Sequence, residues 1–141
     1  MFHLTVLCTG TLKESYLRDA VSEYQKRLSG YCAFRILEKK PAQFLPILAA
    51  SHAYKIALCV EGALRSSEAL ASLLESLPTR GYSEAIFVIG DSDGLAEEVK
   101  AACDLRLSFS PMTFPHQLMR VILCEQLYRC MNINGGGKYH K

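Results

Sequence analysis

The hydrophobic pattern of this chain alternates five times between short apolar runs and longer amphipathic stretches. Apolar runs of four to eight residues are typical of buried strands. Between them, apolar residues recur every three or four positions, which predicts helices. Strands that alternate with helices predict an α/β fold, with a mostly parallel sheet and helices on both faces. The expected strands cover residues 3–9, 33–38, 56–60, 85–89 and 105–109.

The last helical stretch, about residues 116–132, differs from the others because its apolar residues point in almost every direction around the axis. Such a helix is buried on more than one side. In a chain of 141 residues, we expect the second side to be covered by another subunit. A central helix within one monomer is the alternative. Within this stretch, Glu125 and Arg129 are spaced to form an ion pair, whereas Arg120 has no such partner in the helix.

Length and composition favour one soluble domain that spans residues 1–141, because this is near the common domain size. No apolar run approaches the roughly 20 residues that cross a bilayer, and no secretory signal precedes the first strand. We therefore expect a cytoplasmic protein without membrane association. The six cysteines include no Cys-x-x-Cys pair, so we expect free thiols and no metal site.

The formal net charge is +2, but the charges are unevenly distributed. The part of the chain after residue 109 is locally basic, which suits an anionic partner such as RNA. An ordinary solvated surface explains this excess equally well. Against the single acid Glu125 stand Arg120, Arg129, Lys138 and Lys141.

Three connections are candidates for a binding site. In open α/β sheets, ligands bind where loops leave the carboxyl ends of the strands. This rule selects residues 58–62, 90–94 and 109–115. The second loop is rich in glycine but matches neither the phosphate-binding nor the dinucleotide-binding pattern. In the third loop, Pro111 and Pro115 restrict the backbone.

These loops also carry a family resemblance that covers the whole chain. Four motifs carry it: Val88-Ile-Gly-Asp-Ser-Asp-Gly-Leu95, Leu107 to Val121 with its Met-Thr-Phe-Pro-His-Gln core, Glu125-Gln-Leu-Tyr-Arg129 and Tyr139-His140. In these motifs the sequence is similar to the RlmH family of SPOUT methyltransferases. The resemblance implies a trefoil knot in the C-terminal region, about residues 85–141, and a homodimer. Periodicity alone predicts an unknotted sheet.

The resemblance also implies an activity, namely methylation of ring nitrogen N3 of a pseudouridine in a stem-loop of 23S ribosomal RNA. The methyl donor is S-adenosylmethionine, and the RNA is part of the large subunit or the assembled ribosome. The implied cofactor contacts are Leu58, Gly90, Phe109, Ser110, Pro111, Met112, Thr113 and Phe114. For Met112 and Phe114, packing in the core is an equally good interpretation.

Methylation of N3 requires loss of its proton, and three residues are hypothetical catalysts. His140 is the general-base candidate, because histidine exchanges protons near neutral pH, and Tyr139 is a weaker one. Arg120, or alternatively Lys138, is a cation that can stabilise an anionic base. We expect His116 to cap the last helix or to pack its loop.

Three departures from the family pattern leave questions open. Asp91 replaces a glycine and either attracts the cofactor sulfonium or crowds the site. Cys59 replaces an acidic residue, and Lys138 replaces a proline before Tyr139-His140. The alternative function is a catalytically inactive, ribosome-associated RNA-binding dimer.

Overall fold

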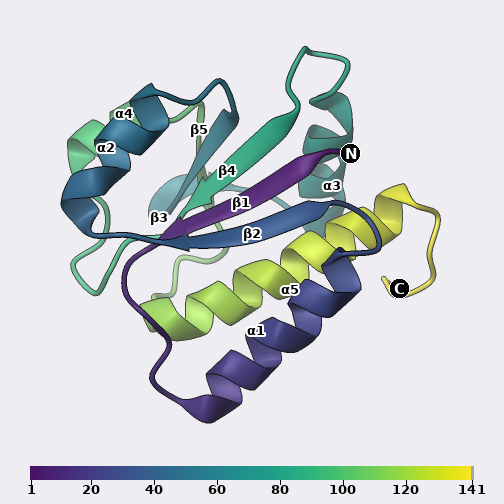
Figure 1. Ribbon diagram of the computed structural model, residues 1–141. Coiled ribbons are helices and arrows are strands. Elements are labelled where there is room, and N and C mark those ends of the chain that lie inside the picture. The colour runs from purple at the N-terminus through teal and green to yellow at the C-terminus, as the bar shows by residue number, and fades with distance from the viewer. Residues whose placement is uncertain (141) are drawn as a thin grey trace.

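The fold of residues 1–140 is described by a computed structural model (Figure 1). Within these 140 residues, five strands and five helices alternate, as the hydrophobic pattern predicts. In order they are β1 (His3–Cys8), α1 (Ser15–Leu28), β2 (Ala33–Glu38), α2 (Pro41–Ala49), β3 (Tyr54–Leu64), α3 (Ser67–Ser76), β4 (Glu84–Val88), α4 (Glu97–Ala101), β5 (Leu105–Ser108) and α5 (His116–Asn134).

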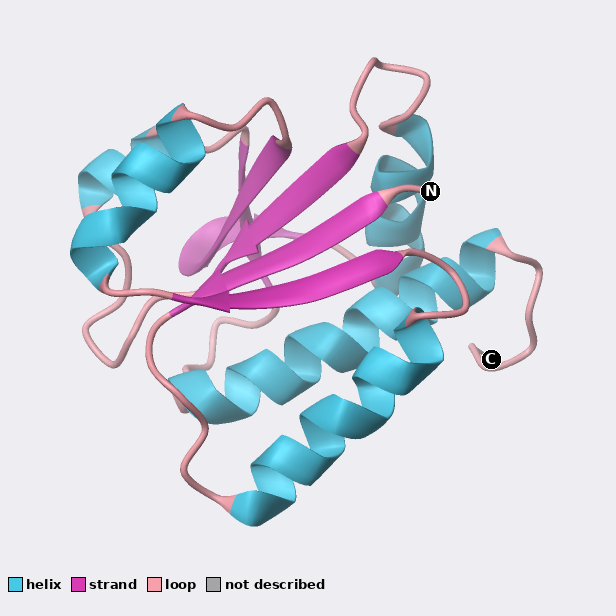
Figure 2. Cartoon of the chain, in the orientation of Figure 1, coloured by secondary structure: helices cyan, strands magenta, loops and turns pink. Residues whose placement is uncertain are grey.

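The strands form one sheet in the order β2-β1-β4-β3-β5, and every neighbouring pair is parallel. Helices α2 and α4 cover one face, where Phe44 and Leu48 pack against the strands. Helices α1, α3 and α5 cover the other face (Figure 2). The predicted α/β architecture with helices on both faces is therefore confirmed.

Strand β3 extends beyond the expected residues 56–60 because it changes register against β5. Both Leu58 and Ala63 pair with Leu107, so the residues between them leave the ladder. Gly62 crosses β5 so closely that a Cβ atom would lie 2.7 Å from the carbonyl carbon of Arg106. The bulge turns the backbone of residues 59–61 away from the sheet at its carboxyl edge.

Helix α1 begins three residues later than its apolar pattern starts. Leu12 is buried beside Leu17 and Val21, which explains the continuous pattern, but the preceding chain is a loop. Gly10 has a φ of 71°, which is readily adopted only by glycine. The Arg18 guanidinium closes the loop by donating hydrogen bonds to the carbonyl oxygens of Leu12 (3.0 Å) and Lys13 (2.7 Å).

Helix α5 is buried on several sides within one protomer. It packs against α1, α3 and the sheet, and its residues Leu123, Cys124, Leu127 and Cys130 are fully buried. Most of the all-round apolar surface of α5 is therefore covered within the chain, as the alternative interpretation of a central helix in a monomer predicts. Exposed apolar surface remains near the start of the helix, at Leu118. None of the helices in residues 1–140 is both long and apolar enough to cross a membrane.

Candidate active site

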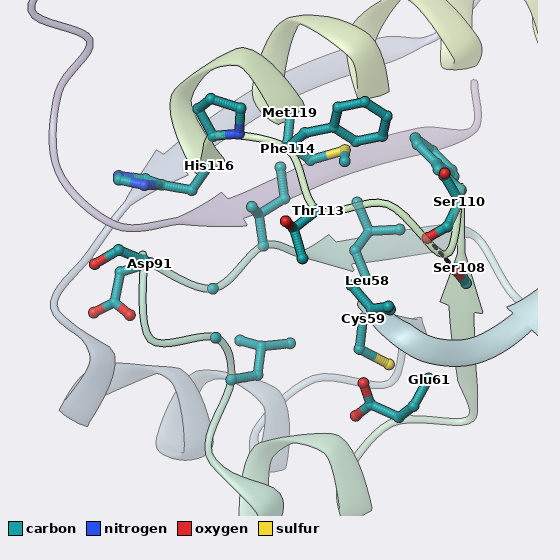
Figure 3. A pocket seen from close by; sticks show the side chains of 18 of the residues that line it. Leu58, Cys59, Glu61, Asp91, Ser108, Ser110, Thr113, Phe114, His116 and Met119 are labelled. Atoms are coloured by element: carbon teal, nitrogen blue, oxygen red, sulfur yellow. Dashed lines mark hydrogen bonds between the residues drawn. The ribbon is translucent and has the colours of Figure 1, made fainter.

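A cavity of about 820 Å³ lies at the carboxyl edge of β3, β4 and β5 (Figure 3). This volume is within the range of roughly 300–1,000 Å³ that is common for small-molecule sites. The three loops selected from the sequence meet there. The lining consists of residues 58–61, 89–95, 107–110 and 112–116, together with Lys100 and Met119.

All but one of the implied cofactor contacts line this cavity. The exception is Pro111, which is exposed. Met112 is 73% exposed and Phe114 is 38% exposed, so neither side chain is part of the core. The cavity-lining residues from the implied set are Leu58, Gly90, Phe109, Ser110, Met112, Thr113 and Phe114.

The turn after β4 leaves no room for a side chain at Gly90. A Cβ atom there would lie 2.5 Å from the carbonyl carbon of Gly94. Gly94 has a φ of 81°, and its amide donates a hydrogen bond to the carbonyl oxygen of Asp91 (2.9 Å). The Asp91 carboxylate accepts a bond from the amide of Asp93 (2.9 Å). This closed turn presents backbone, rather than side chain, to the cavity at Gly90.

The cavity wall is predominantly anionic. It contains the carboxylates of Glu61, Asp91 and Asp93, and its lysine, Lys100, is paired with Glu61. The hydrogen bond between these two groups lowers the pKa of Glu61 and raises the pKa of Lys100. Burial, and then the neighbouring Glu61, raise the pKa of the Cys59 thiol, so this thiol is neutral at physiological pH.

The third loop is held by its own serines and leads directly into α5. The Ser108 hydroxyl donates to the carbonyl oxygen of Ser110 (3.1 Å), and the Ser110 hydroxyl accepts from the amide of Met112 (3.0 Å). Pro115 occupies the N-cap position of α5, where no side-chain cap forms. The expected capping role of His116 is therefore wrong. Its side chain instead lines the cavity, on the same side as Asp91 in Figure 3.

Arg120 lies outside the cavity lining and is only 2% exposed. Its Nη1 forms an ion pair with the Glu38 carboxylate (2.6 Å), and its Nη2 donates to the carbonyl oxygens of Thr9 and Gly10 (3.1 Å each). The sequence indicated no partner within the helix, but the fold supplies one from β2. In this protomer the guanidinium holds the ends of β1 and β2 against α5, which is a structural role.

The side chains of the tail dock on the second half of α5. The Tyr139 hydroxyl donates to the Glu125 carboxylate (2.6 Å), and this bond is the main reason why the pKa of Tyr139 rises to about 12. His140 contacts Arg129 through Nδ1 (3.1 Å) and Glu68 through Nε2. The predicted ion pair between Glu125 and Arg129 is confirmed, with an Nε–Oε1 distance of 3.2 Å.

Asn132 organises the tail and was not singled out from the sequence. It is 7% exposed. Its side-chain oxygen accepts from the amide of Tyr139 (3.0 Å), and its backbone oxygen accepts from the amide of Gly137 (2.8 Å). The sequence feature that could have identified Asn132 is an amide side chain near the end of an apolar helix, just before the run of glycines. Lys138 is exposed, and Lys141 lies outside the described residues.

The tail and the cavity lie at different positions along α5. His116 lines the cavity, whereas Glu125 and Arg129 contact the tail. At about 1.5 Å per residue, these contacts are roughly 14–20 Å from the start of the helix. Tyr139 and His140 are not among the residues that line the cavity. The structure therefore gathers the implied cofactor contacts but not the three hypothetical catalysts.

Comparison with known proteins identifies relatives along the whole chain. Residues 2–140 match the family model described as "Predicted SPOUT methyltransferase". A protein from Clostridium novyi named ribosomal RNA large subunit methyltransferase H is 45% identical, and the alignment covers 99% of each chain. Proteins with the same name from Shouchella clausii and Clostridioides difficile are 41% and 40% identical, with the same coverage.

Solved structures resemble the fold at low sequence identity. A probable methylase family protein from Haemophilus influenzae has a TM-score of 0.62 at 11% identity, over 99% of this chain and 70% of that one. The SpoU methyltransferase AviRb from Streptomyces viridochromogenes, in complex with the cofactor AdoMet, has a TM-score of 0.51 at 8% identity. The match covers 97% of this chain, which spans 59% of the length of AviRb.

Proposed function

The chain belongs to the RlmH family of SPOUT methyltransferases, and from this premise we propose that it methylates large-subunit ribosomal RNA. The donor in this proposal is S-adenosylmethionine, and the acceptor is N3 of a pseudouridine in a 23S stem-loop. The relatives that are 40–45% identical are named as ribosomal RNA large subunit methyltransferases. Ribosomal RNA places the proposed activity in the cytoplasm.

The observation that carries the proposal is the cavity formed by the three loops and its anionic wall. S-adenosylmethionine has a sulfonium, an ammonium and one carboxylate, so its net charge is positive. Asp91 and Asp93 give the wall the opposite sign, while the charge of Glu61 is balanced by Lys100. Backbone at Gly90 allows the close approach that a flat adenine requires. The residues of this cavity therefore fit the cofactor.

When bound, the cofactor supplies an activated methyl group, so the protein's part is to bind, orient and exclude water. Positioning of this kind can lower a barrier by roughly 7–11 kcal/mol in favourable cases. The serine-tied loop and the closed turn at Gly90 provide rigid walls. Met112 and Phe114 provide exposed apolar surface at the mouth, where a nucleobase can be shielded from water.

The proton on N3 needs an acceptor, and we keep His140 in this role with Tyr139 beside it. The tail of the same protomer docks away from the cavity, so the proposal requires a homodimer in which the partner's tail approaches the cavity. The exposed apolar surface at Leu118 supports such a contact. We also propose one domain over residues 1–141 with the C-terminal knot. The crossing of β5 by Gly62 supports the knot, because it brings the β3 loop against the C-terminal segment.

The experiment uses ribosomes from a strain without this gene, purified protein and S-adenosylmethionine with a labelled methyl group. Digestion and mass mapping of the 23S RNA should find one new methyl on a pseudouridine. A label on another base would contradict the proposed acceptor. Absence of label from ribosomes, subunits and free RNA would contradict the activity.

The alternative, an inactive RNA-binding dimer, is favoured by one observation. Asp91 stands on the cavity wall, where a carboxylate can exclude the cofactor's own carboxylate. Calorimetry with S-adenosylmethionine separates the two functions. Binding without methyl transfer to any ribosomal RNA, or no binding at all, supports the alternative.

A further inference from the structure

A second hollow, of about 480 Å³, lies between the edge strand β2 and helix α2. Figure 1 shows where these two elements lie in the fold. We call it the β2–α2 groove. It shares no lining residue with the cavity described above. Its lining consists of Arg35, Leu37, Lys39, Ala42, Gln43, Pro46 and Ile47.

The groove follows from the alternation of side chains along β2. Successive residues of a strand point to opposite faces, so Arg35 and Leu37 share the sheet face on which α2 lies. Lys39 is the first residue after β2; its amide still bonds to β1, and it lines the groove with them. The intervening residue Glu38 points to the other face, where Arg120 binds it. Strand, groove and helix are close together because only residues 39–40 connect β2 to α2.

Helix α2 does not cover this face of β2, because the buried residues of α2 pack against the inner strands β1 and β4. Phe44 and Leu48 belong to the cluster that contains Leu7 of β1 and Ile86 of β4. Pro46 and Ala42 are exposed on the side toward β2. The hollow that remains beside β2 has apolar lining at Leu37 and Ile47.

The rim of the groove is cationic. Lys39 is exposed, and within residues 1–140 its ammonium forms no ion pair. The Arg35 side chain is 59% exposed; its Nε donates to the Thr5 hydroxyl (3.1 Å) and its Nη2 approaches Glu84 (3.4 Å). No carboxylate occurs among the described residues that line the groove. The Glu84 carboxylate partly neutralises the charge of Arg35, but the Nη1 group of Arg35 can still donate hydrogen bonds to a ligand.

The spacing of the two cations suits a polyanion better than a single anion. Arg35 and Lys39 are four residues apart on an extended strand, which corresponds to about 13 Å. The Arg35 guanidinium is held by Thr5 and Glu84, so it is not free to turn toward Lys39 and share one phosphate with it. A strand of RNA along the groove can give one phosphate to each cation, while Leu37 and Ile47 contact a ribose or a base.

The groove also lies near the cofactor cavity. The amide of Lys39 donates to the carbonyl oxygen of Cys8 (2.8 Å), which places Lys39 at the carboxyl end of β1. Strand β4, which ends at the cavity turn, is the next neighbour of β1. Two strand spacings amount to about 10 Å. An RNA strand with its target base at the cavity can therefore reach the groove within a few nucleotides.

We propose that the β2–α2 groove binds the backbone of the substrate RNA beside the target nucleotide, with Lys39 and Arg35 contacting different phosphates of one strand. The inference rests on the proposed function, since it assigns a surface to the same substrate. The groove selects and positions RNA, and it makes no contact with the reacting atoms.

The test compares Lys39→Glu with Lys26→Glu as the matched control. Lys26 is an exposed lysine in the last turn of α1, remote from the groove. The probe is the large ribosomal subunit from a strain without this gene, titrated over a range of salt concentrations. Lys39→Glu should weaken binding about 10-fold and reduce the salt slope by about one, as expected for a lost phosphate contact. Lys39→Ala should do the same to a smaller degree, while Lys26→Glu should bind like the unmodified protein.

Affinity for S-adenosylmethionine should be equal in all variants, and KM for subunits should rise more than kcat falls. If Lys39→Glu binds the large subunit with unchanged affinity and unchanged salt dependence, the proposal that the groove binds RNA is wrong. A photo-crosslinking amino acid in place of Ala42 should label RNA; labelling only ribosomal protein would also overturn it. If the unmodified protein transfers no methyl, the proposed function fails, and the binding and crosslinking results still decide the groove.

Discussion

Replacing Gly90 with alanine should abolish cofactor binding without unfolding the protein. The new Cβ would lie 2.5 Å from the carbonyl carbon of Gly94, 2.7 Å from its oxygen and 2.8 Å from the amide nitrogen of Leu95. Ordinary contact needs about 3.5 Å, so the turn must move by about 1 Å. These contacts are with backbone, and no side chain can rotate away to relieve them.

The expected destabilisation is about 1–3 kcal/mol, as for other overpacked sites. For a chain of this size, it lowers Tm by about 3–10 °C. The effect on function should be larger, because a shift of about 1 Å in a positioning loop can cost on the order of 100-fold in rate. We expect at least that loss in affinity for S-adenosylmethionine.

Calorimetry at 25 °C measures the affinity, and thermal denaturation verifies that the variant is folded. Gly30→Ala is the matched control, because a Cβ at Gly30 meets only the carbonyl oxygen of Arg27 at 3.8 Å. It should retain both Tm and affinity. A folded Gly90→Ala protein that binds S-adenosylmethionine as tightly as the control would refute the assignment of this turn to the cofactor.

Three further predictions concern the residues outside the cavity. Arg120→Leu should lower the free energy of unfolding by about 1–3 kcal/mol in urea titrations, because the carbonyl oxygens of Thr9 and Gly10 lose their donor. Full stability with lost activity would instead favour a catalytic role for Arg120. The stabilisation from the Tyr139–Glu125 bond should be present at pH 7–10 and be lost as the pH rises toward 12, because the raised pKa means that the bond stabilises the neutral phenol. The difference between the absorbance titrations of the unmodified protein and Tyr139→Phe isolates this phenol; a midpoint near 10 in the difference curve would contradict the prediction. Asn132→Ala should speed amide exchange in residues 137–139 and reduce methyl transfer, while leaving cofactor affinity intact; unchanged exchange would show that the tail is held elsewhere.

Because the tail and the cavity are separate, the Gly90 and Asn132 variants should change different properties. Changes at Gly90 act on cofactor affinity, whereas changes at Asn132 act on the tail, roughly 14–20 Å away along α5. If both variants lost cofactor affinity equally, the proposed division of roles between cavity and tail would be wrong.

Local sequence was sufficient for the elements and for the cavity loops. Strand and helix periods depend on neighbouring residues, so the five alternations and the Glu125–Arg129 pair were predictable. The loops that line the cavity follow from the rule that parallel strands end at one edge. Glycine at positions 90 and 94 marked the tight turn in advance.

Contacts between distant residues decided the rest. Arg120 looked unpaired because its partner Glu38 lies 82 positions away in the chain. His116 looked like a cap because nothing local shows that its side chain faces the cavity. The strand order, the bulge of β3 at Gly62 and the docking of the tail on α5 likewise depend on how elements pack. The hydrophobic period of the sequence indicates which face of each element is buried. Only the tertiary structure determines which residues pack against that face.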